Sequence, residues 1–340
     1  MILENTLYLT TPGSYAHLDH ETIIVEADHV VLIRVPLHHL GAIVAYGNVL
    51  VSPYLIHRLA QDGKSLSWMT EYGAFRGRLQ GPSSGNVLLR VAQQTAARQQ
   101  SLEIARMFVA GKIHNQRQVL VRGGRDAGTE GQRRQLLKAV RAVTAIGRNV
   151  SRFTTVNALR GLEGIIGRQY FRAFPALIRQ DDAAWTFTGR NRRPPKDPIN
   201  ALLSFGYAML TQECQSACEV VGLDPQIGFL HVLRPGRPAL ALDLMEEFRA
   251  HVVDRLVLSV VNRRQITAED FLYRPGGSVV LQEKGRKTFI MAYQKRKQEE
   301  IHHELLKQNV PIGLLPIYQA KILARFLRGD LSSYQPFLFR

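Results

Sequence analysis

The sequence predicts an α+β protein in which a small N-terminal β-strand domain, residues 1–85, precedes a larger, mainly α-helical domain, residues 86–340. Three observations favour this division. Short β-branched runs occupy the first part, apolar residues at three- and four-residue spacing fill the rest, and a Gly/Pro/Ser cluster separates the two. A chain of 340 residues with 45% hydrophobic composition is long enough to bury a core in each domain.

Three short β-branched runs separated by turn residues predict the N-terminal strands. They begin at Thr22, Val30 and Asn48 and have the composition of extended chain. We therefore expect a small, mostly antiparallel β domain. Between Arg76 and Asn86 the chain contains the sequence GPSSG, which is the best candidate for an interdomain linker.

Apolar residues recur at helical spacing in six segments of the second domain. Asp197-Pro198 is a good helix start, because an Asp side chain caps free amides and Pro fits the first turn. One short hairpin that begins near Ser278 interrupts the helices. The predicted helices are residues 87–112, 131–148, 155–180, 198–222, 239–262 and 287–308.

The positive charge of the chain lies entirely in its second part. The formal net charge is +16, from 44 Lys and Arg against 28 Asp and Glu. Residues 1–90 have a net charge of −1 (6 against 7), whereas residues 91–340 have +17 (38 against 21). Such a surplus in one domain indicates a polyanionic partner.

Neither a membrane segment nor a secretion signal is expected. No run of 18 apolar residues is present, and the N-terminus MILENTLYLT carries an acid where a signal peptide carries positive charge. The two cysteines, Cys214 and Cys218, are four residues apart in a helical pattern, which excludes a disulfide framework. We expect both thiols to pack in the core.

Two carboxylates lie on helix faces that should be apolar. In the helix that begins near Thr155, a 100° step per residue places Glu163 in the sector that faces the core. Glu246 lies in the apolar stripe of segment 239–262, with Asp243 at its edge. A buried ionised carboxylate loses hydration worth roughly several kcal/mol unless a cation compensates. The core residues are Leu159, Leu162, Ile166, Tyr170 and Ala173 in the first segment and Leu242, Met245, Val253, Leu256 and Val260 in the second.

Two explanations of these carboxylates remain open at this point. Arg249 shares the second stripe and could neutralise Glu246 one helical turn away, with another arginine neutralising Glu163, as in structural ion pairs. Alternatively, the carboxylates share a metal ion. His231 ends the apolar run 227–230, just before the helix that bears Glu246, and a histidine there is either a hydrogen-bonded structural residue or a ligand. Spacing alone does not decide between these explanations.

Four motifs, taken in order, resemble the CRISPR-associated spacer-acquisition integrases, the "Cas one" family. The resemblance runs nearly end to end, and the segment 190–196 is most similar to the type I-C branch. The C-terminal sequence Tyr334-Gln-Pro-Phe is also similar to the usual end of the family. The four motifs are LRGLEG (159–164), NALLSFGY (200–207), GFLH (228–231) and DLMEEFR (243–249).

This resemblance implies a catalytic metal site. The metal ligands of the family correspond to Glu163, His231 and Glu246, and a further acidic position of the catalytic site corresponds to Asp243. Two carboxylates and one imidazole suit Mg²⁺ or Mn²⁺, whereas structural zinc favours thiolates. The cation would polarise a phosphoryl oxygen and stabilise charge on the attacking or leaving oxygen.

The resemblance also implies a reaction and a set of partners. A 3′-hydroxyl of a short double-stranded DNA fragment attacks a phosphodiester at the end of a CRISPR repeat, in the prokaryotic cytoplasm. The N-terminal domain would form a homodimer, two such dimers would bind a central dimer of the small partner "Cas two", and some systems add a "Cas four" nuclease. Two alternatives remain: a structure-specific metal-dependent DNA nuclease, and a non-catalytic DNA-binding scaffold with ion-paired acids.

Overall fold

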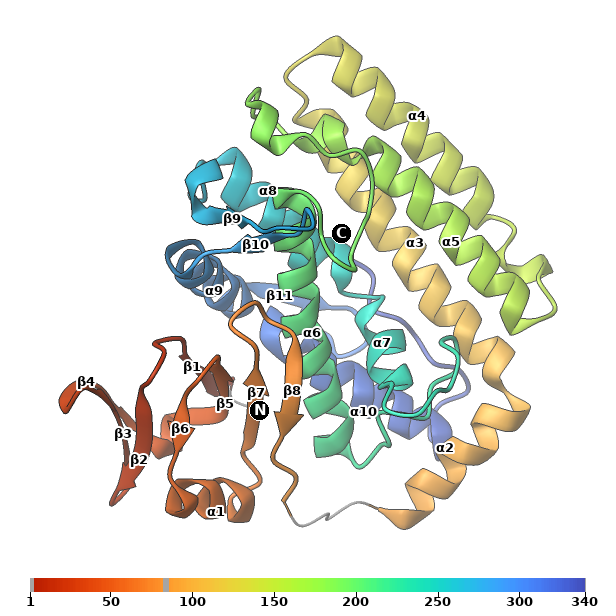
Figure 1. The fold of residues 1–340 in the computed structure, drawn as a ribbon. Helices are drawn as coiled ribbons and strands as arrows, with labels where there is room; N and C mark the ends of the chain where they lie inside the picture. Colours follow the sequence, from red (N-terminus) through yellow and green to blue (C-terminus); the bar gives the residue numbers. More distant parts are fainter. Residues whose placement is uncertain (1–2, 82–85, 340) are drawn as a thin grey trace. The chain divides into compact units, whose positions relative to one another are not determined.

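The computed structural model describes residues 3–81 and 86–339, and the chain divides into two compact units, residues 1–84 and 85–340 (Figure 1). This division is one residue from the expected boundary, and the predicted linker lies partly outside the described residues. The α+β prediction is confirmed, because strands dominate the first unit and helices the second. No helix within the described ranges is long and apolar enough to cross a membrane.

The first unit contains two four-stranded sheets, with strand orders β1-β5-β7-β8 and β4-β3-β2-β6. The prediction of a mostly antiparallel domain holds for only half of the strand pairs: β2–β3, β3–β4 and β7–β8 are antiparallel. The pairs β1–β5, β5–β7 and β2–β6 are parallel. A parallel pair needs a crossover, and helix α1 lies in the connection between β5 and β7. The elements are β1 (Asn5–Leu9), β2 (Tyr15–Asp19), β3 (Thr22–Ala27), β4 (Val30–Pro36), η1 (Leu37–His39), β5 (Leu40–Tyr46), β6 (Leu50–Val51), α1 (Pro53–Gln61), β7 (Ser65–Met69) and β8 (Phe75–Arg78).

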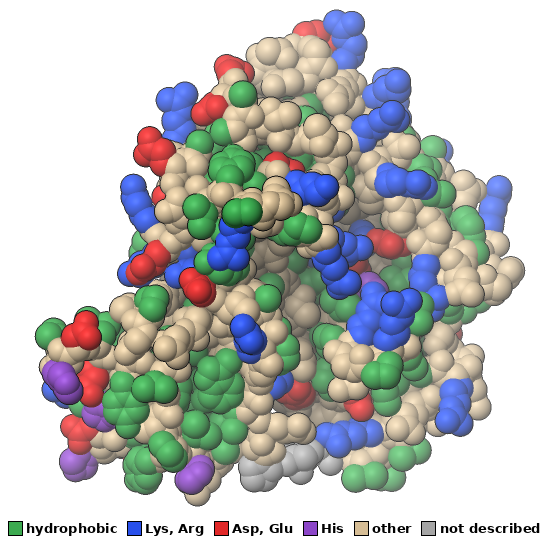
Figure 2. Space-filling view, viewed as in Figure 1, with side chains coloured by type: hydrophobic (Ala, Val, Ile, Leu, Met, Phe, Trp, Pro, Cys, Tyr) green, Lys and Arg blue, Asp and Glu red, His purple; other side chains and the backbone are tan. Residues whose placement is uncertain are grey.

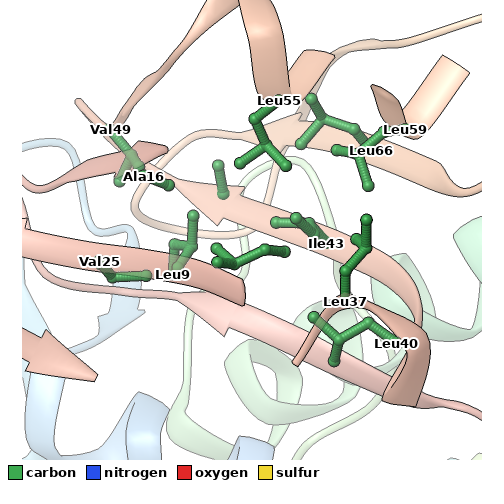
Figure 3. Packing of buried hydrophobic residues seen from close by; sticks show 12 residues of the cluster. Leu9, Ala16, Val25, Leu37, Leu40, Ile43, Val49, Leu55, Leu59 and Leu66 are labelled. Atoms are coloured by element: carbon green, nitrogen blue, oxygen red, sulfur yellow. The ribbon is translucent and has the colours of Figure 1, made fainter. Parts of the chain in front are cut away.

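Helix α1 was not predicted, although its start has a clear signal. The Ser52 side chain accepts a hydrogen bond from the Leu55 amide at 3.1 Å, and Pro53 occupies the first turn. Leu55 and Leu59 of this helix pack with Ile43 of β5 in a core of fully buried side chains (Figure 3). The first unit therefore has a hydrophobic core of its own.

Strand β4 is an edge strand that exposes apolar side chains. It pairs only with β3 in its sheet. Val30, Val31, Leu32 and Ile33 are between 42% and 62% exposed. Natural edge strands usually carry charge or are covered, so this strand is a candidate contact surface.

The second unit is built on helices. Helices α3, α4 and α5 pack against one another in one layer, and α6 packs against α7 and α10 (Figure 1). Cys214 and Cys218 on α6 are both buried, as expected. The helices are α2 (Val87–Gln99), α3 (Ser101–Arg125), α4 (Glu130–Gly147), η2 (Val150–Arg152), α5 (Val156–Ala173), η3 (Phe174–Leu177), η4 (Ala183–Trp185), α6 (Pro198–Val221), α7 (Ala239–Met245), the π-helix η5 (Arg249–Asp254), α8 (Arg255–Asn262), η6 (Ala268–Asp270), α9 (Glu283–Gln298), η7 (Ile312–Leu314) and α10 (Leu315–Leu327).

Four predicted helices differ from the observed elements. The segment 155–180 ends its α-helix at Ala173 and continues only as the short 3-10 helix η3. The segment 87–112 is two helices that meet at Gln100, and the second continues to Arg125. The segment 239–262 is α7, a turn, a π-helix and α8 rather than one helix. The segment 287–308 ends its helix at Gln298 and continues as a hairpin. The strands of this unit form two small sheets, β9 (Phe271–Tyr273) with β10 (Val279–Leu281) and β11 (Glu300–His303) with β12 (Gln308–Pro311).

Candidate active site

His231 is held in place by Asp243 of α7. The Asp243 side chain is fully buried and accepts hydrogen bonds from the amides of Phe229, Leu230 and His231 at 2.6, 2.9 and 2.9 Å. The same carboxylate lies 2.6 Å from Nδ1 of His231. Because Asp243 contacts Nδ1, the other ring nitrogen, Nε2, remains available for a further interaction.

Gly228 makes this contact between loop and helix feasible. A Cβ atom at this position would lie 2.7 Å from the carbonyl carbon of Ala239 and 2.7 Å from Oδ2 of Asp243. No side chain fits at such distances, so the first residue of the GFLH motif is required for the close approach. The close approach of the motif backbone to α7 therefore places His231 beside Asp243.

Glu163 on α5 and Glu246 after α7 converge on one cation, the side chain of Lys112 on α3. The Lys112 Nζ lies 2.7 Å from Oε2 of Glu246 and also contacts Oε1 of Glu163. Lys112 is 4% exposed, Glu246 2% and Glu163 28%. His231 Nε2 lies 4.0 Å from Oε1 of Glu246, so the imidazole borders the same site.

Glu246 is an ionised carboxylate in a buried position. Burial alone would raise its pKa, but the positive charges of Arg249 and Lys112 hold the pKa well below the usual value. The Arg249 Nη1 lies 2.7 Å from Oε1 of Glu246, so the ion pair anticipated from spacing is present. The guanidinium carbon of Arg249 also lies 4.3 Å from the ring centre of Tyr207, which adds a cation–π contact.

The structure thus brings all four predicted site residues, Glu163, His231, Glu246 and Asp243, into one region, in two different roles. Glu163 and Glu246 contact the Lys112 ammonium and Nε2 of His231 lies 4.0 Å from Oε1 of Glu246, whereas Asp243 contacts the histidine through its other ring nitrogen, Nδ1. Within residues 3–81 and 86–339, no group of three or more His, Cys, Asp and Glu side chains is arranged closely enough to hold a metal ion.

The donor set nevertheless suits a divalent cation. Oε2 of Glu246 is buried and has no hydrogen bond of good geometry in the described part of the chain, although it lies 2.7 Å from Lys112 Nζ. Two carboxylates already converge on one positive charge, and the imidazole is oriented by a carboxylate, as is usual for metal-ligating histidines.

The site lies in a basic cleft with a volume of about 820 Å³. Eight of the lining residues are Lys or Arg, against two glutamates, and Figure 2 shows Lys and Arg side chains gathered around a recess of this unit. This concentration of charge in a concavity suits the phosphates of a nucleic acid. The basic lining residues are Lys112, Arg160, Arg168, Arg172, Arg190, Arg192, Arg237 and Arg249.

Sequence reasoning missed Lys112, and its ion-pair explanation, one of two left open, named another arginine as the partner of Glu163. The signal was present, because Lys112 follows Ile104 and Phe108 at four-residue spacing on the buried face of α3. The basic segment 190–196 also contributes to the site. The Arg190 guanidinium bonds to Asn200 Oδ1 at 2.6 Å and lines the cleft, and burial lowers its pKa to about 10.

Comparisons with known proteins agree on one family. The sequence profile described as "CRISPR associated protein Cas1" matches residues 7–295. The "CRISPR-associated endonuclease Cas1 1" of Moorella thermoacetica is 50% identical over 341 residues, covering 100% of this chain and 99% of the relative. A "CRISPR-associated exonuclease Cas4/endonuclease Cas1 fusion" of Geobacter sulfurreducens is 34% identical and covers 98% of this chain and 60% of the fusion.

Two solved structures share the fold. A casposase bound to its integration product superposes with a TM-score of 0.83 at 20% identity, covering 98% of this chain and 93% of that one. A chain of a Cas6-RT-Cas1–Cas2 complex has a TM-score of 0.83 at 24% identity, covering 99% of this chain and 36% of the other. From the profile match and the full-length identity to its relatives, the chain belongs to the Cas1 family of CRISPR-associated endonucleases.

Proposed function

We propose that this protein is a metal-dependent integrase and endonuclease that joins the 3′-hydroxyl ends of short DNA fragments to the CRISPR repeat array. The convergence of two carboxylates on one cation position, inside a basic cleft, carries this proposal. The reaction is a transesterification at phosphorus, in which the incoming 3′-hydroxyl displaces another 3′-hydroxyl. It needs no covalent protein intermediate.

Glu163, Glu246 and His231 would hold the divalent cation. Metal dependence belongs to the family, and its identity as Mg²⁺ or Mn²⁺ is part of the proposal, since carboxylates and imidazole suit these ions. When bound, the ion polarises the phosphoryl oxygen and stabilises charge on the attacking or leaving oxygen. Asp243 contacts Nδ1 of His231 and would thereby leave Nε2 available as a ligand of the ion.

The arginines of the cleft would position the DNA. Arg168 and Arg172 on α5 line the same cleft as Glu163. Their guanidinium groups suit phosphate oxygens, which fix the register of the strand without reading its sequence. The strand end would then be brought to the carboxylates.

The decisive experiment is a strand-transfer assay with a supercoiled CRISPR-array target and the purified small partner, with Mg²⁺ or Mn²⁺ varied. We expect Glu246→Gln to abolish joined product while the variant still binds DNA. His231→Ala with full activity in both metals would refute the site assignment. Hydrolysed ends without joined product would support the alternative of a structure-specific nuclease instead.

A non-catalytic scaffold is the second alternative, and one observation favours it. Lys112 and Arg249 already pair with the two glutamates, as in a salt-bridged core. Calorimetric titration with Mn²⁺ separates the metal-dependent enzyme from the scaffold. The enzyme should bind Mn²⁺ at a site that Glu163→Gln removes, whereas a salt-bridged core has no such site.

The proposal includes assembly and location. The exposed apolar edge strand β4 would mediate a homodimer through the first unit. A chain of a Cas6-RT-Cas1–Cas2 complex shares this fold, which supports the small partner Cas2, and the Cas4–Cas1 fusion relative supports Cas4 as a further partner. Double-stranded DNA would supply both the fragment and the array, in the prokaryotic cytoplasm.

A further inference from the structure

Lys112 takes up the position that the proposed metal ligands share. Its ammonium group contacts Oε1 of Glu163 and lies 2.7 Å from Oε2 of Glu246. In the described part of the chain Lys112 is the only ion-pair partner of Glu163. A single side chain from α3 therefore joins two carboxylates from separate elements.

The charges at this position are already balanced. Glu163 and Glu246 carry two negative charges, and Lys112 and Arg249 supply two positive ones within ion-pair distance. A divalent cation that entered without any movement would leave a surplus of two positive charges in a buried site, which is strongly unfavourable in a low dielectric. One of the two basic groups must give way.

Of the two basic groups, Lys112 is the one that can be displaced more easily. Arg249 is fixed by Glu246 and by the Tyr207 ring, whereas a lysine has a flexible four-carbon chain and a compact charge. Lys112 also lines the cleft of about 820 Å³. An ammonium displaced from the carboxylates can therefore swing into the cleft, where the proposed DNA phosphates lie.

Resting on the proposed function, we propose that Lys112 and the divalent metal compete for Glu163 and Glu246, and that the displaced lysine binds a DNA phosphate. Metal binding and DNA binding are thereby coupled through one side chain. Linkage requires the coupling to be reciprocal: metal tightens DNA binding by the same factor by which DNA tightens metal binding.

The first test is metal affinity without any reaction. Mn²⁺ is titrated by calorimetry into the full-length protein and into Lys112→Met. We expect the variant to bind Mn²⁺ at least tenfold more tightly, because its competitor is gone, and to melt at lower temperature unless Mn²⁺ is present. Equal or weaker Mn²⁺ binding by a folded Lys112→Met would overturn the proposal.

A matched control separates this effect from general loss of a buried ion pair. Lys297 is also buried and lies 2.6 Å from Oε1 of Glu213. Lys297→Met should lower the melting temperature to a similar degree and leave Mn²⁺ affinity unchanged. A tenfold gain in this control as well would attribute the effect to overall charge, against the proposal.

The second test measures the coupling itself. Binding of a fluorescent DNA duplex with single-stranded 3′ ends is followed by anisotropy, with and without Mn²⁺, in the wild type and in Lys112→Met. We expect Mn²⁺ to tighten DNA binding in the wild type and this gain to shrink at least threefold in the variant. An unchanged gain contradicts the role of the displaced lysine.

These outcomes remain distinct from failure of the proposed function. If Mn²⁺ binding is insensitive to both Glu163→Gln and Glu246→Gln, the metal site itself is wrong. If Mn²⁺ binding needs both glutamates but does not respond to Lys112→Met, only the competition is wrong.

Discussion

At the scale of single residues, the site is defined by buried charges and by what each of them touches. Glu246 keeps its negative charge because Arg249 and Lys112 lie beside it, despite burial. Asp243 keeps its place because three backbone amides and one imidazole nitrogen point at it. In the proposed site, the first arrangement keeps the Glu246 ligand ionised and the second orients the imidazole of His231.

Replacing Asp243 should separate positioning from ligation. The Asp243 carboxylate accepts hydrogen bonds from three backbone amides and contacts His231 Nδ1, and Asp243→Asn removes its negative charge. We therefore expect the free energy of unfolding to fall by about 2 kcal/mol. Metal affinity should fall about 10- to 100-fold through misorientation of His231. Urea unfolding and Mn²⁺ calorimetry measure the two effects.

The same loop provides a control for this variant. Asp224 also accepts an amide hydrogen bond, from Gln226 at 2.8 Å. Asp224→Asn should leave Mn²⁺ affinity intact. Equal losses of metal affinity in both variants would argue against a specific role of Asp243.

Asp254 should make stability depend on pH. Its carboxylate is buried, and burial raises its pKa from 3.8 to about 6, against hydrogen bonds from Tyr207 and Tyr170 and the charge of Arg249. The folded protein therefore keeps this proton between pH 4 and 6 while the unfolded chain loses it. As pH rises through this window, the free energy of unfolding should fall by about 3 kcal/mol, at 1.36 kcal/mol per pKa unit.

Asp254→Asn removes this titration while it preserves the shape of the side chain. The difference in unfolding free energy between wild type and variant, measured in urea from pH 4 to pH 7, should shift by about 3 kcal/mol in favour of the variant. A shift of the opposite sign would mean that the charged form is the one stabilised in the folded protein.

The sequence pattern identified the two buried carboxylates, but not the lysine with which both form ion pairs. Glu163 and Glu246 stand out because a charge interrupts an apolar stripe, and the same test applied to α3 points to Lys112. His231 has no such signal, because a histidine at the end of an apolar run is compatible with several roles. Only the resemblance singled it out as a ligand, and that assignment stays a prediction.

At the scale of elements, the segment after α7 is decisive and was mispredicted. The periodicity of residues 239–262 is that of one helix, yet the chain forms a turn at 246–248 and then the π-helix η5. Local sequence does not specify this break, because the forces that produce it come from distant residues. π-helical turns are frequent at functional sites.

The C-terminal segment 331–339 stabilises this break. Oε2 of the buried Glu247 accepts hydrogen bonds from the Phe337 amide at 2.7 Å and from Gln319 Nε2 at 2.9 Å, and Tyr334 donates to its Oε1. A Cβ at Gly111 would lie 2.8 Å from Cβ of Pro336, so only glycine lets the segment pass this close to α3. The segment thus packs between α3, which carries Lys112, and the turn at 246–248, which contains Glu246.

Tyr334→Phe should weaken this support without altering the packing of the ring. Loss of one hydrogen bond to a buried carboxylate should cost about 1–3 kcal/mol of unfolding free energy. Strand transfer should fall as well, because the turn that carries Glu246 becomes less fixed. Tyr293→Phe removes a comparable hydrogen bond, 2.9 Å to Glu213 Oε2, and should cost stability while sparing strand transfer. Similar activity in the two variants would count against a role of the segment in the site.

At the scale of the whole molecule, the proposals place assembly and chemistry in different parts of the chain. All of the site residues belong to the second unit, which also carries the positive charge, whereas the apolar edge strand β4 belongs to the first. The charge contrast was evident from the sequence. The parallel pairing of β1, β5 and β7 was not, because strand order depends on long-range contacts that β-branched runs do not encode.

A charge on β4 should therefore change assembly alone. Ile33 is 46% exposed on the edge strand, and Ile33→Lys would bury an ammonium in the proposed dimer contact. We expect the dimer dissociation constant in sedimentation equilibrium to rise at least tenfold, with Mn²⁺ affinity unchanged. Tyr54→Lys, an exposed position on α1, serves as control. A variant at position 33 that dimerises like the wild type would place the contact elsewhere.

The separate core of the first unit, built around Ile43, Leu55 and Leu66, has a consequence for the history of such proteins. Because this unit buries its own apolar surface, substitutions in it need not be compensated by the catalytic unit. Evolution can then alter how copies assemble, or attach new partners at the first unit, while the chemistry of the second stays the same. The proposed activity of the second unit could therefore be retained while the assembly formed through the first unit changes.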